Sequence, residues 1–219
     1  MENILPFIFI GFFFVMFFGL IMLALKSSKK MQAQFESLAQ KYGLEYIPPK
    51  GKIFKSKPQI DGSLFGKTVQ IYTYTTGSGK NKQTYTKFSL LPFDKDLILR
   101  ISREGFFDKI GKAFGGQDIQ IGDELLDKQY RFKCNRENEM LQWIDNDIAE
   151  MLKSIHKKFS GSIIVSKGQL SYSQHGIISS DKARDRFEKL MAVLFALSQN
   201  LDGIKIAETP EQTHDLEFE

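Results

Sequence analysis

The sequence predicts an α+β protein in which an N-terminal transmembrane helix precedes an antiparallel-sheet domain that ends in a long C-terminal helix. Residues 4–25 contain no charged side chain. The region after them is rich in β-branched and aromatic residues interrupted by turn signals, which is typical of strands. A strong helical pattern then begins at Asp181 and stops at Gly203. Strands followed by helices favour an α+β fold with an antiparallel sheet.

The first segment, residues 1–25, is expected to be an uncleaved membrane anchor. At 1.5 Å per residue, residues 4–25 would span about 33 Å, enough to cross a hydrocarbon core of about 30 Å. A cleaved signal peptide is the alternative, but no Lys or Arg precedes the apolar run, and the run is too long. Lys26, Lys29 and Lys30 follow it at once, so the positive-inside rule places the C-terminal side in the cytoplasm and the N-terminus outside.

Residues 26–43 are predicted to form a juxtamembrane helix. Met31, Phe35, Leu38 and Tyr42 recur at helical spacing, and Gly43 is well placed to terminate the helix. This helix is either a stalk or an amphipathic helix packed on the domain.

Several strands are expected next. Asp61-Gly62 and Gly66 are interpreted as turns between hairpin strands. The GSGKNK run at 77–82 lacks the spacing of a phosphate-binding loop and is interpreted as a hairpin tip. Residues 96–103 alternate cleanly, which predicts a strand buried on one side.

Helical signals dominate the second half. Residues 104–116 read as a loop held by its Phe side chains, or as a short turn that docks on a membrane. A strand at 130–135 is followed by one or two helices over 137–159, with Asp145 as an N-cap. A hairpin turns at Lys167-Gly168, and Ser180 or Asp181 caps the terminal helix.

The predicted cytoplasmic domain covers residues 44–206, and residues 207–219 form an acidic flexible tail. Two arrangements stay open: a pleckstrin-homology-like barrel of seven strands with an inserted helix, or two small lobes at about 44–103 and 118–206.

The charge is concentrated next to the membrane. Residues 26–93 hold 12 Lys and no Arg against Glu36, Glu45 and Asp61, a net charge of +9. Anionic headgroups of the inner leaflet would attract such a segment, with these candidate contacts: Lys26, Lys29, Lys30, Lys80 and Lys82. The alternative is that the charge only sets topology and solubility.

No pattern predicts catalysis, a metal site or a cofactor. His156, His175 and His214 each stand alone in the sequence, so we expect His156 on the surface, His175 in a turn and His214 in the tail. The lone Cys134 needs no functional role. No signature of nucleic-acid binding is present, and an enzyme whose site is assembled from scattered residues stays open as an alternative.

The run from Asp118 to Ile144 resembles a pattern in uncharacterised bacterial single-pass membrane proteins, "I-G-D-x-x-x-D-x-x-[FY]-x-[FV]" before a helix, a hairpin and a terminal helix. The matching positions are Ile121, Gly122, Asp123, Asp127, Tyr130 and Phe132. The order of elements over about 95–203 is similar too. The resemblance implies a bacterial source and this architecture, and it transfers no functional residue.

Together these features predict a single-pass protein of the bacterial inner membrane whose cytoplasmic domain is an interaction or scaffold module without catalytic activity. Its expected partners are the bilayer and either another protein or a second copy of the chain. An anionic-lipid-binding or sensing module is the alternative function.

Overall fold

The computed structural model describes residues 5–51, 56–103 and 118–203 of the chain. The predicted loop at 104–116 and the predicted tail at 207–219, with His214, lie outside these residues. The helices are α1 (Leu5–Tyr42), α2 (Glu124–Gln129), α3 (Glu137–Trp143), α4 (Asn146–Ile155) and α5 (Asp181–Leu201), with short 3-10 turns η1 (Gly79–Asn81) and η3 (His156–Lys158).

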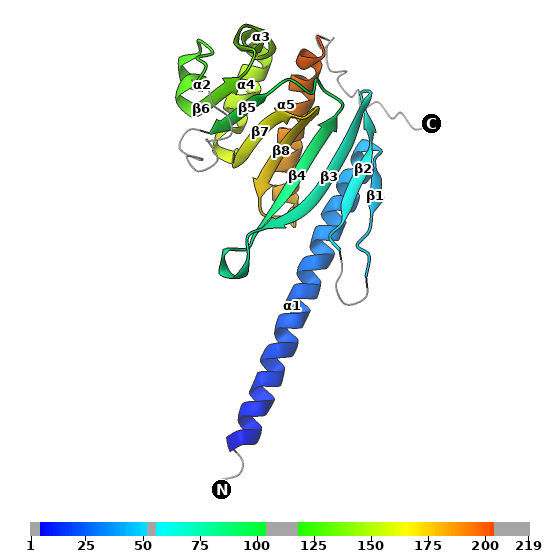
Figure 1. Cartoon of the computed structure of the whole chain (residues 1–219). Coiled ribbons are helices and arrows are strands. Elements are labelled where there is room, and N and C mark those ends of the chain that lie inside the picture. The colour runs from blue at the N-terminus through cyan, green and yellow to red at the C-terminus, as the bar shows by residue number, and fades with distance from the viewer. Residues whose placement is uncertain (1–4, 52–55, 104–117, 204–219) are drawn as a thin grey trace, which may run out of the picture. The chain divides into compact units, whose positions relative to one another are not determined.

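The described strands form one eight-stranded antiparallel sheet in the order β1-β2-β3-β4-β8-β7-β5-β6. They are β1 (Glu45–Ile47), β2 (Gln59–Leu64), β3 (Lys67–Thr76), β4 (Gln83–Leu91), β5 (Leu99–Arg103), β6 (Tyr130–Cys134), β7 (Gly161–Ser166) and β8 (Gln169–His175). An N-terminal helix, an antiparallel sheet and a long C-terminal helix confirm the predicted α+β class (Figure 1). The strand order is linear, with β1 and β6 at its ends, whereas a pleckstrin-homology-like barrel would close.

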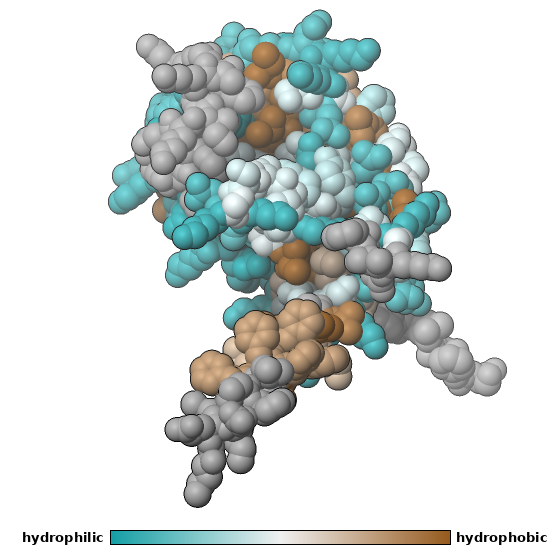
Figure 2. Space-filling model, turned by 60° about the horizontal axis from the view of Figure 1, so that its bottom comes forward, coloured by the Kyte–Doolittle hydropathy of each residue, from teal (hydrophilic) through white to brown (hydrophobic). Residues whose placement is uncertain are grey.

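The helix α1 is long and apolar enough to cross a membrane by length and composition. Its apolar window is not buried by any other part of the structure. Phe12 is 66% exposed and Val15 is 72% exposed. In Figure 2 the brown side chains of α1 project from a surface that is mostly teal and white. The helix continues without a break through the predicted anchor and the predicted juxtamembrane segment.

The chain divides into two compact units, each built from two stretches of sequence: Met1–Leu91 with Ser173–Glu188, and Pro92–Tyr172 with Lys189–Glu219. We call them unit 1 and unit 2. Two small lobes, at about 44–103 and 118–206, were one of the two arrangements that the sequence left open. In the structure, β8 and α5 each contribute residues to both units.

In unit 1 the C-terminal part of α1 is a core element. Phe35 and Leu38 are fully buried, and Met31 is 8% exposed. Of the two alternatives for this segment, the structure therefore shows the packed helix and not the stalk. Gly43, at φ 63°, ends α1 as predicted, in a left-handed conformation that glycine adopts without strain.

The turn predicted at Asp61-Gly62 is wrong, because both residues lie inside β2. A Cβ on Gly62 would lie 2.7 Å from Leu44 Cδ2, so the glycine permits close packing. The turn predicted at Gly66 is confirmed: Phe65-Gly66 joins β2 to β3, with φ values of 51° and 75° that fit a type I′ hairpin.

Unit 2 explains the motif at Ile121–Asp127. The Asp127 carboxylate accepts hydrogen bonds from the N–H groups of Ile121 (2.8 Å) and Gly122 (3.1 Å). Asp123 caps α2 by accepting from Leu125 and Leu126, both at 3.0 Å. These acidic residues therefore stabilise a turn and a helix start.

The strand β5 is buried on both faces, contrary to the prediction for 96–103. Leu99 and Ile101 are fully buried, and Arg100 and Ser102 are only 5% and 8% exposed. The strand lies inside the sheet, where it pairs with both β6 and β7.

Other local predictions in unit 2 are confirmed. Residues 137–159 form two α-helices, and the Asp145 side chain caps α4 by accepting from the Ile148 N–H at 2.9 Å. Lys167 and Gly168 form the β7–β8 turn at φ 52° and 76°. In unit 1, Ser180 Oγ accepts from the Ala183 N–H at 3.3 Å and so caps α5.

Candidate functional site

Strand direction places the β3–β4 hairpin tip at the end of unit 1 from which the apolar part of α1 emerges. After α1 ends, the Leu44 N–H bonds to the Ala39 carbonyl, and β1 runs back along the helix. Because β1 pairs antiparallel with β2, and β2 with β3, β3 also runs back in this direction. The tip at 77–82 therefore lies on the same side as the N-terminal part of α1 (Figure 1).

Six lysines lie at this end, and we call them the lysine end: Lys26, Lys29, Lys30, Lys57, Lys80 and Lys82. The five that the sequence singled out all have exposed side chains. Within the part of the chain that the structure describes, none of these five has a carboxylate within salt-bridge distance. By contrast, Lys41 and Lys153 do form ion pairs. Among the described residues, these five lysines thus form a surface of uncompensated positive charge.

The lysines of α1 and those of the hairpin lie at the same end of unit 1, but they do not form one continuous patch. Lys26, Lys29 and Lys30 recur at i, i+3 and i+4 and so occupy one face of α1. The buried residues Phe35 and Leu38 occupy a different face. The positive charge is therefore spread around the point where α1 leaves unit 1.

Lys57 belongs to the lysine end, although the sequence did not single it out. Its ammonium donates a hydrogen bond to Thr75 Oγ1 at 3.1 Å, beside the hairpin tip. Partial burial, and then the positive charge of Lys82, lower the pKa of Lys57. Sequence reasoning missed it because its proximity to Lys82 follows from the pairing of β2, β3 and β4.

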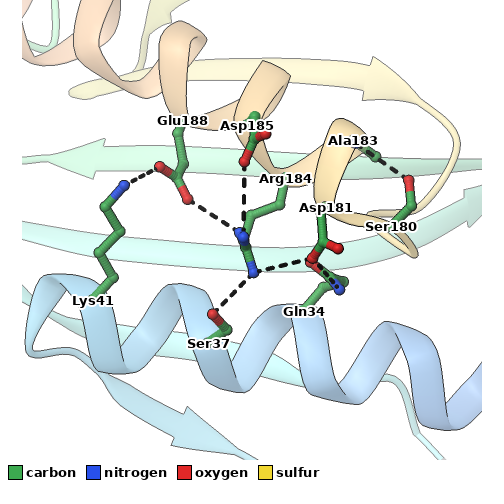
Figure 3. Close-up of polar contacts among 9 residues, drawn as sticks. All are labelled: Gln34, Ser37, Lys41, Ser180, Asp181, Ala183, Arg184, Asp185 and Glu188. Atoms are coloured by element: carbon green, nitrogen blue, oxygen red, sulfur yellow. Dashed lines mark hydrogen bonds and ion pairs between the residues drawn. The ribbon is translucent and has the colours of Figure 1, made fainter.

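A ladder of polar contacts fastens α1 to α5 (Figure 3). Gln34 donates to Asp181 at 3.2 Å, Ser37 accepts from Arg184 at 3.0 Å, and Lys41 donates to Glu188. In each pair the partners are 147 residues apart, so the two helices run parallel and in register.

The ladder is anchored by a partly buried ion pair. The side chains of Arg184 and Glu188 are 22% and 12% exposed, and their charged groups lie 3.4 Å apart. The hydrogen bond to Glu188 is the main cause that raises the pKa of Lys41. Together with the buried Phe35 and Leu38, these contacts hold the C-terminal half of α1 in a fixed orientation within unit 1.

Little chain separates the apolar part of α1 from unit 1. Leu25 is the last residue of the uncharged run, and Met31 is the first buried one. Six residues of helix correspond to about 9 Å. The polar headgroup layer on each side of a bilayer is about 5–8 Å thick. A membrane-spanning α1 would therefore hold unit 1 directly at the headgroups.

A row of aromatic residues crosses the other face of the sheet in unit 1. Tyr74 stacks on Tyr85 at 5.5 Å between ring centroids, and Tyr72 lies 6.2 Å from Tyr74. His175 packs edge-on against Tyr85 at 5.6 Å. The predicted turn position of His175 is wrong, since it is the last residue of β8. Phe88 points to the opposite face, toward Phe187 of α5.

The remaining candidate residues from the sequence are His156, Cys134 and possible metal ligands. His156 is not on the open surface as predicted but partly buried, 5.5 Å from the ring of Tyr130. Burial is the main cause that raises the pKa of the Cys134 thiol. Within the described residues, no group of three or more His, Cys, Asp or Glu side chains could hold a metal ion.

The sequence matches no protein-family model and no curated protein. Among solved structures the chain is similar in fold to the mycobacterial trehalose monomycolate transport factor A, TtfA, with a TM-score of 0.53 and 9% sequence identity. The similarity covers 82% of this chain and 98% of the TtfA chain. At this identity the comparison shows a shared fold.

Proposed function

We propose that the chain is a membrane-anchored interaction module without catalytic activity, in which α1 crosses the bacterial inner membrane and holds the folded part on the cytoplasmic side. The observation that carries the proposal is the continuity of α1, whose apolar half is exposed and whose other half is buried in unit 1. A rigid connection of this kind suits a protein that presents a surface at a fixed height above the bilayer.

The aromatic row is the surface we propose for a protein partner. Tyrosines bury large contact areas at low entropic cost, and they are enriched in protein interfaces. Tyr74, Tyr85 and His175 lie on the face of the unit 1 sheet opposite to Phe88 and α5. The TtfA structure is that of a transport factor, and the proposal takes only the architecture from it.

Site-specific photocrosslinking in native membranes tests the interaction module. A photoreactive residue at position 74 or 85 should yield a reproducible crosslinked protein. The same residue at Lys182, on an exposed part of α5, is the matched control. Crosslinks that are absent at both positions, or equally strong at the control, would contradict the proposed surface.

Contact with anionic lipid is the second candidate function, favoured by the position of the lysine end. Each lysine near an anionic leaflet contributes about 1 kcal/mol of attraction within a Debye length, which is about 8 Å at physiological salt. Lys80 and Lys82 stand on a hairpin tip that extends toward the apolar part of α1 (Figure 1). Anionic headgroups would also offset the repulsion between Lys82 and Lys57, which adds to the attraction.

Hydrogen exchange of the full chain in nanodiscs tests this second function. The hairpin tip should be protected in discs containing anionic lipid but not in zwitterionic discs, and high salt should remove the protection. The double variant Lys80→Gln/Lys82→Gln should lose it, whereas Lys67→Gln, at the far end of β3, should keep it. Exchange that is independent of lipid charge would rule the contact out.

A further inference from the structure

A cavity in unit 2 collects positive charge from segments that are distant in the sequence. It has a volume of about 370 Å³, opens partly to solvent, and is lined by Arg103, Leu125, Lys128, Gln129 and His156. Arg103 ends β5, the next three residues belong to α2, and His156 follows α4. Ligand sites in proteins commonly measure about 300–1,000 Å³, so the cavity suits a small ligand or a single chemical group.

Among the residues that the structure describes, the cations of this cavity have no carboxylate partner. Neither Arg103 nor Lys128 has an ion-pair partner among the residues that the structure describes. Elsewhere in unit 2 such partners are common: Arg136 pairs with Asp94, and Lys153 pairs with Asp123. Two cations at one cavity without a counter-charge are costly unless an anion binds between them.

The acidic residues of the α2 segment are engaged elsewhere or stand apart. Asp123 caps the helix and pairs with Lys153. Asp127 accepts the two backbone N–H groups of the preceding turn. Glu124 lies four residues before Lys128, a spacing that permits an ion pair on a helix, yet the described structure holds no such pair.

Two polar atoms at the cavity lack partners. Gln129 Oε1 and His156 Nδ1 are buried and make no hydrogen bond within the described structure. Buried polar atoms are nearly always paired in proteins, because an unpaired one loses its interaction with water. Both atoms are shielded from solvent, so they are unsatisfied groups behind the cavity surface and not contacts for a ligand in it.

The electrostatics at His156 agree with this geometry. Burial lowers its pKa, and the positive charges of Arg103 and then Lys157 lower it further. No carboxylate among the described residues contributes to the shift. Among the described residues, the groups that face His156 are Arg103 from β5, Lys157 beside it in η3, and the ring of Tyr130 from β6. An anion bound here would raise the pKa of His156.

A larger cavity of about 630 Å³ in unit 2 is less suited to a ligand. Its polar groups satisfy one another, since the Asn200 amide donates to the Trp143 carbonyl and to Asp145 Oδ2, both at 2.9 Å. These bonds join α5 to the start of α4 and have a structural role.

We propose that the smaller cavity binds a phosphate group, with Arg103 and Lys128 pairing with its oxygens and with the His156 ring beside it, close enough to respond to its charge. The guanidinium of Arg matches the spacing of phosphate oxygens and can bind two of them. A phosphate dianion balances two full cations, which a single carboxylate does not. The source is either a free phosphate compound or the phosphomonoester headgroup of a lipid.

Histidine NMR of the full chain in zwitterionic nanodiscs tests the proposal. The chain has three histidines, so isotope-labelled His gives a simple spectrum in which His156 can be assigned with His156→Gln. Inorganic phosphate should raise the pKa of His156 in a saturable manner, while sodium chloride at equal ionic strength should not. Arg103→Gln and Lys128→Gln should each weaken phosphate binding about tenfold, the loss expected for a charged hydrogen bond.

The matched control is Lys158→Gln, which removes an exposed lysine two residues from His156 that does not line the cavity. It should bind phosphate like the unmodified chain. An unchanged His175 resonance shows that each variant is folded. Equal responses of the control and the two cavity variants would overturn the proposal.

A second arm distinguishes the two sources of phosphate. Nanodiscs containing phosphatidic acid supply a phosphomonoester headgroup, and inorganic phosphate supplies the free ion. A His156 response to the lipid alone assigns the cavity to a headgroup, and a response to the free ion alone assigns it to a soluble compound. No response of the unmodified chain to either would refute the phosphate site.

Discussion

The two halves of α1 share one helix and meet opposite surroundings. From Phe12 to Leu23, and at Leu25, the apolar side chains are exposed, with Phe12 at 66% and Phe13 at 73%. From Met31 to Tyr42 only one stripe is apolar, and it is buried, with Phe35 and Leu38 at 0%. A helix that is apolar all round needs an apolar solvent, whereas an apolar stripe needs a single packed surface.

Apolar residues therefore have different roles in the two halves of α1. The first half carries no feature that would specify a protein partner, since it is apolar in every direction. The second half adds polar contacts at fixed positions, such as Ser37 to Arg184 at 3.0 Å. We infer that the first half determines where the protein resides, and the second half determines how unit 1 is oriented there.

Matched substitutions of Phe in the two halves should have very different effects. Phe35→Ala should destabilise the folded chain by about 3–5 kcal/mol, because it leaves a cavity in the core of unit 1. Phe12→Ala should leave this stability unchanged. Chemical denaturation in detergent, followed by tryptophan or far-UV signals, measures both. Similar losses in the two variants would erase the distinction between the halves.

A charged residue should reverse the order of the effects. Val15→Asp places a carboxylate near the centre of the apolar run, which costs about 2.5–3.5 kcal/mol in membrane insertion. Ala33→Asp adds the same charge to an exposed position of the second half. Alkaline extraction of membranes should release the first variant and retain the second. Retention of both would show that the apolar half does not act as an anchor.

The polar ladder should contribute less than the buried stripe. Arg184→Met removes the partner of Ser37 and Glu188 and should cost about 1 kcal/mol, since the pair is only partly shielded from water. Lys182→Met, a nearby exposed position, is the control. Denaturation midpoints of the two variants provide the comparison, and an Arg184 variant as stable as the control would remove the ladder from the account.

The smallest effect should appear at high pH. The pKa of Lys41 is raised in the folded chain by its hydrogen bond to Glu188, so its contribution is fully present below the unfolded value of 10.5. That contribution should fade as the pH rises through the folded pKa. In the Lys41→Met variant, the free energy of unfolding should fall less steeply with pH above 10.5 than in the unmodified chain. In the Lys182→Met variant, the dependence of this free energy on pH should be unchanged.

Local signals in the sequence were sufficient for many elements of the fold. Gly43, Asp145 and Ser180 end or begin helices where their chemistry predicts, and the hairpin at Lys167-Gly168 has the expected turn. In contrast, Gly62 looked like a turn residue because its role depends on Leu44, which reaches it through strand pairing. The helix α2 was not predicted, because its six residues are too few to show a periodic pattern of apolar side chains.

The candidate sites were less predictable, because they are assembled by long-range pairing. The lysines at 26, 29 and 30 were visible as a charge cluster, but their common end with Lys80 and Lys82 follows from the direction of β3. Arg103, Lys128 and His156 are spread over more than fifty residues of sequence. His156 therefore looked like an ordinary surface residue, and only the fold brings the three side chains together.

The central claim is that α1 holds the lysine end of unit 1 at the lipid headgroups. Two single-cysteine variants in a Cys134→Ser background test it: Lys80→Cys at the hairpin tip and Phe65→Cys at the opposite end of β3, where Phe65 is 73% exposed. Each is spin-labelled in nanodiscs that carry a nickel-chelating headgroup lipid. We predict strong relaxation by nickel at position 80 and little at position 65. Equal relaxation at the two positions, or stronger relaxation at 65, would contradict the account.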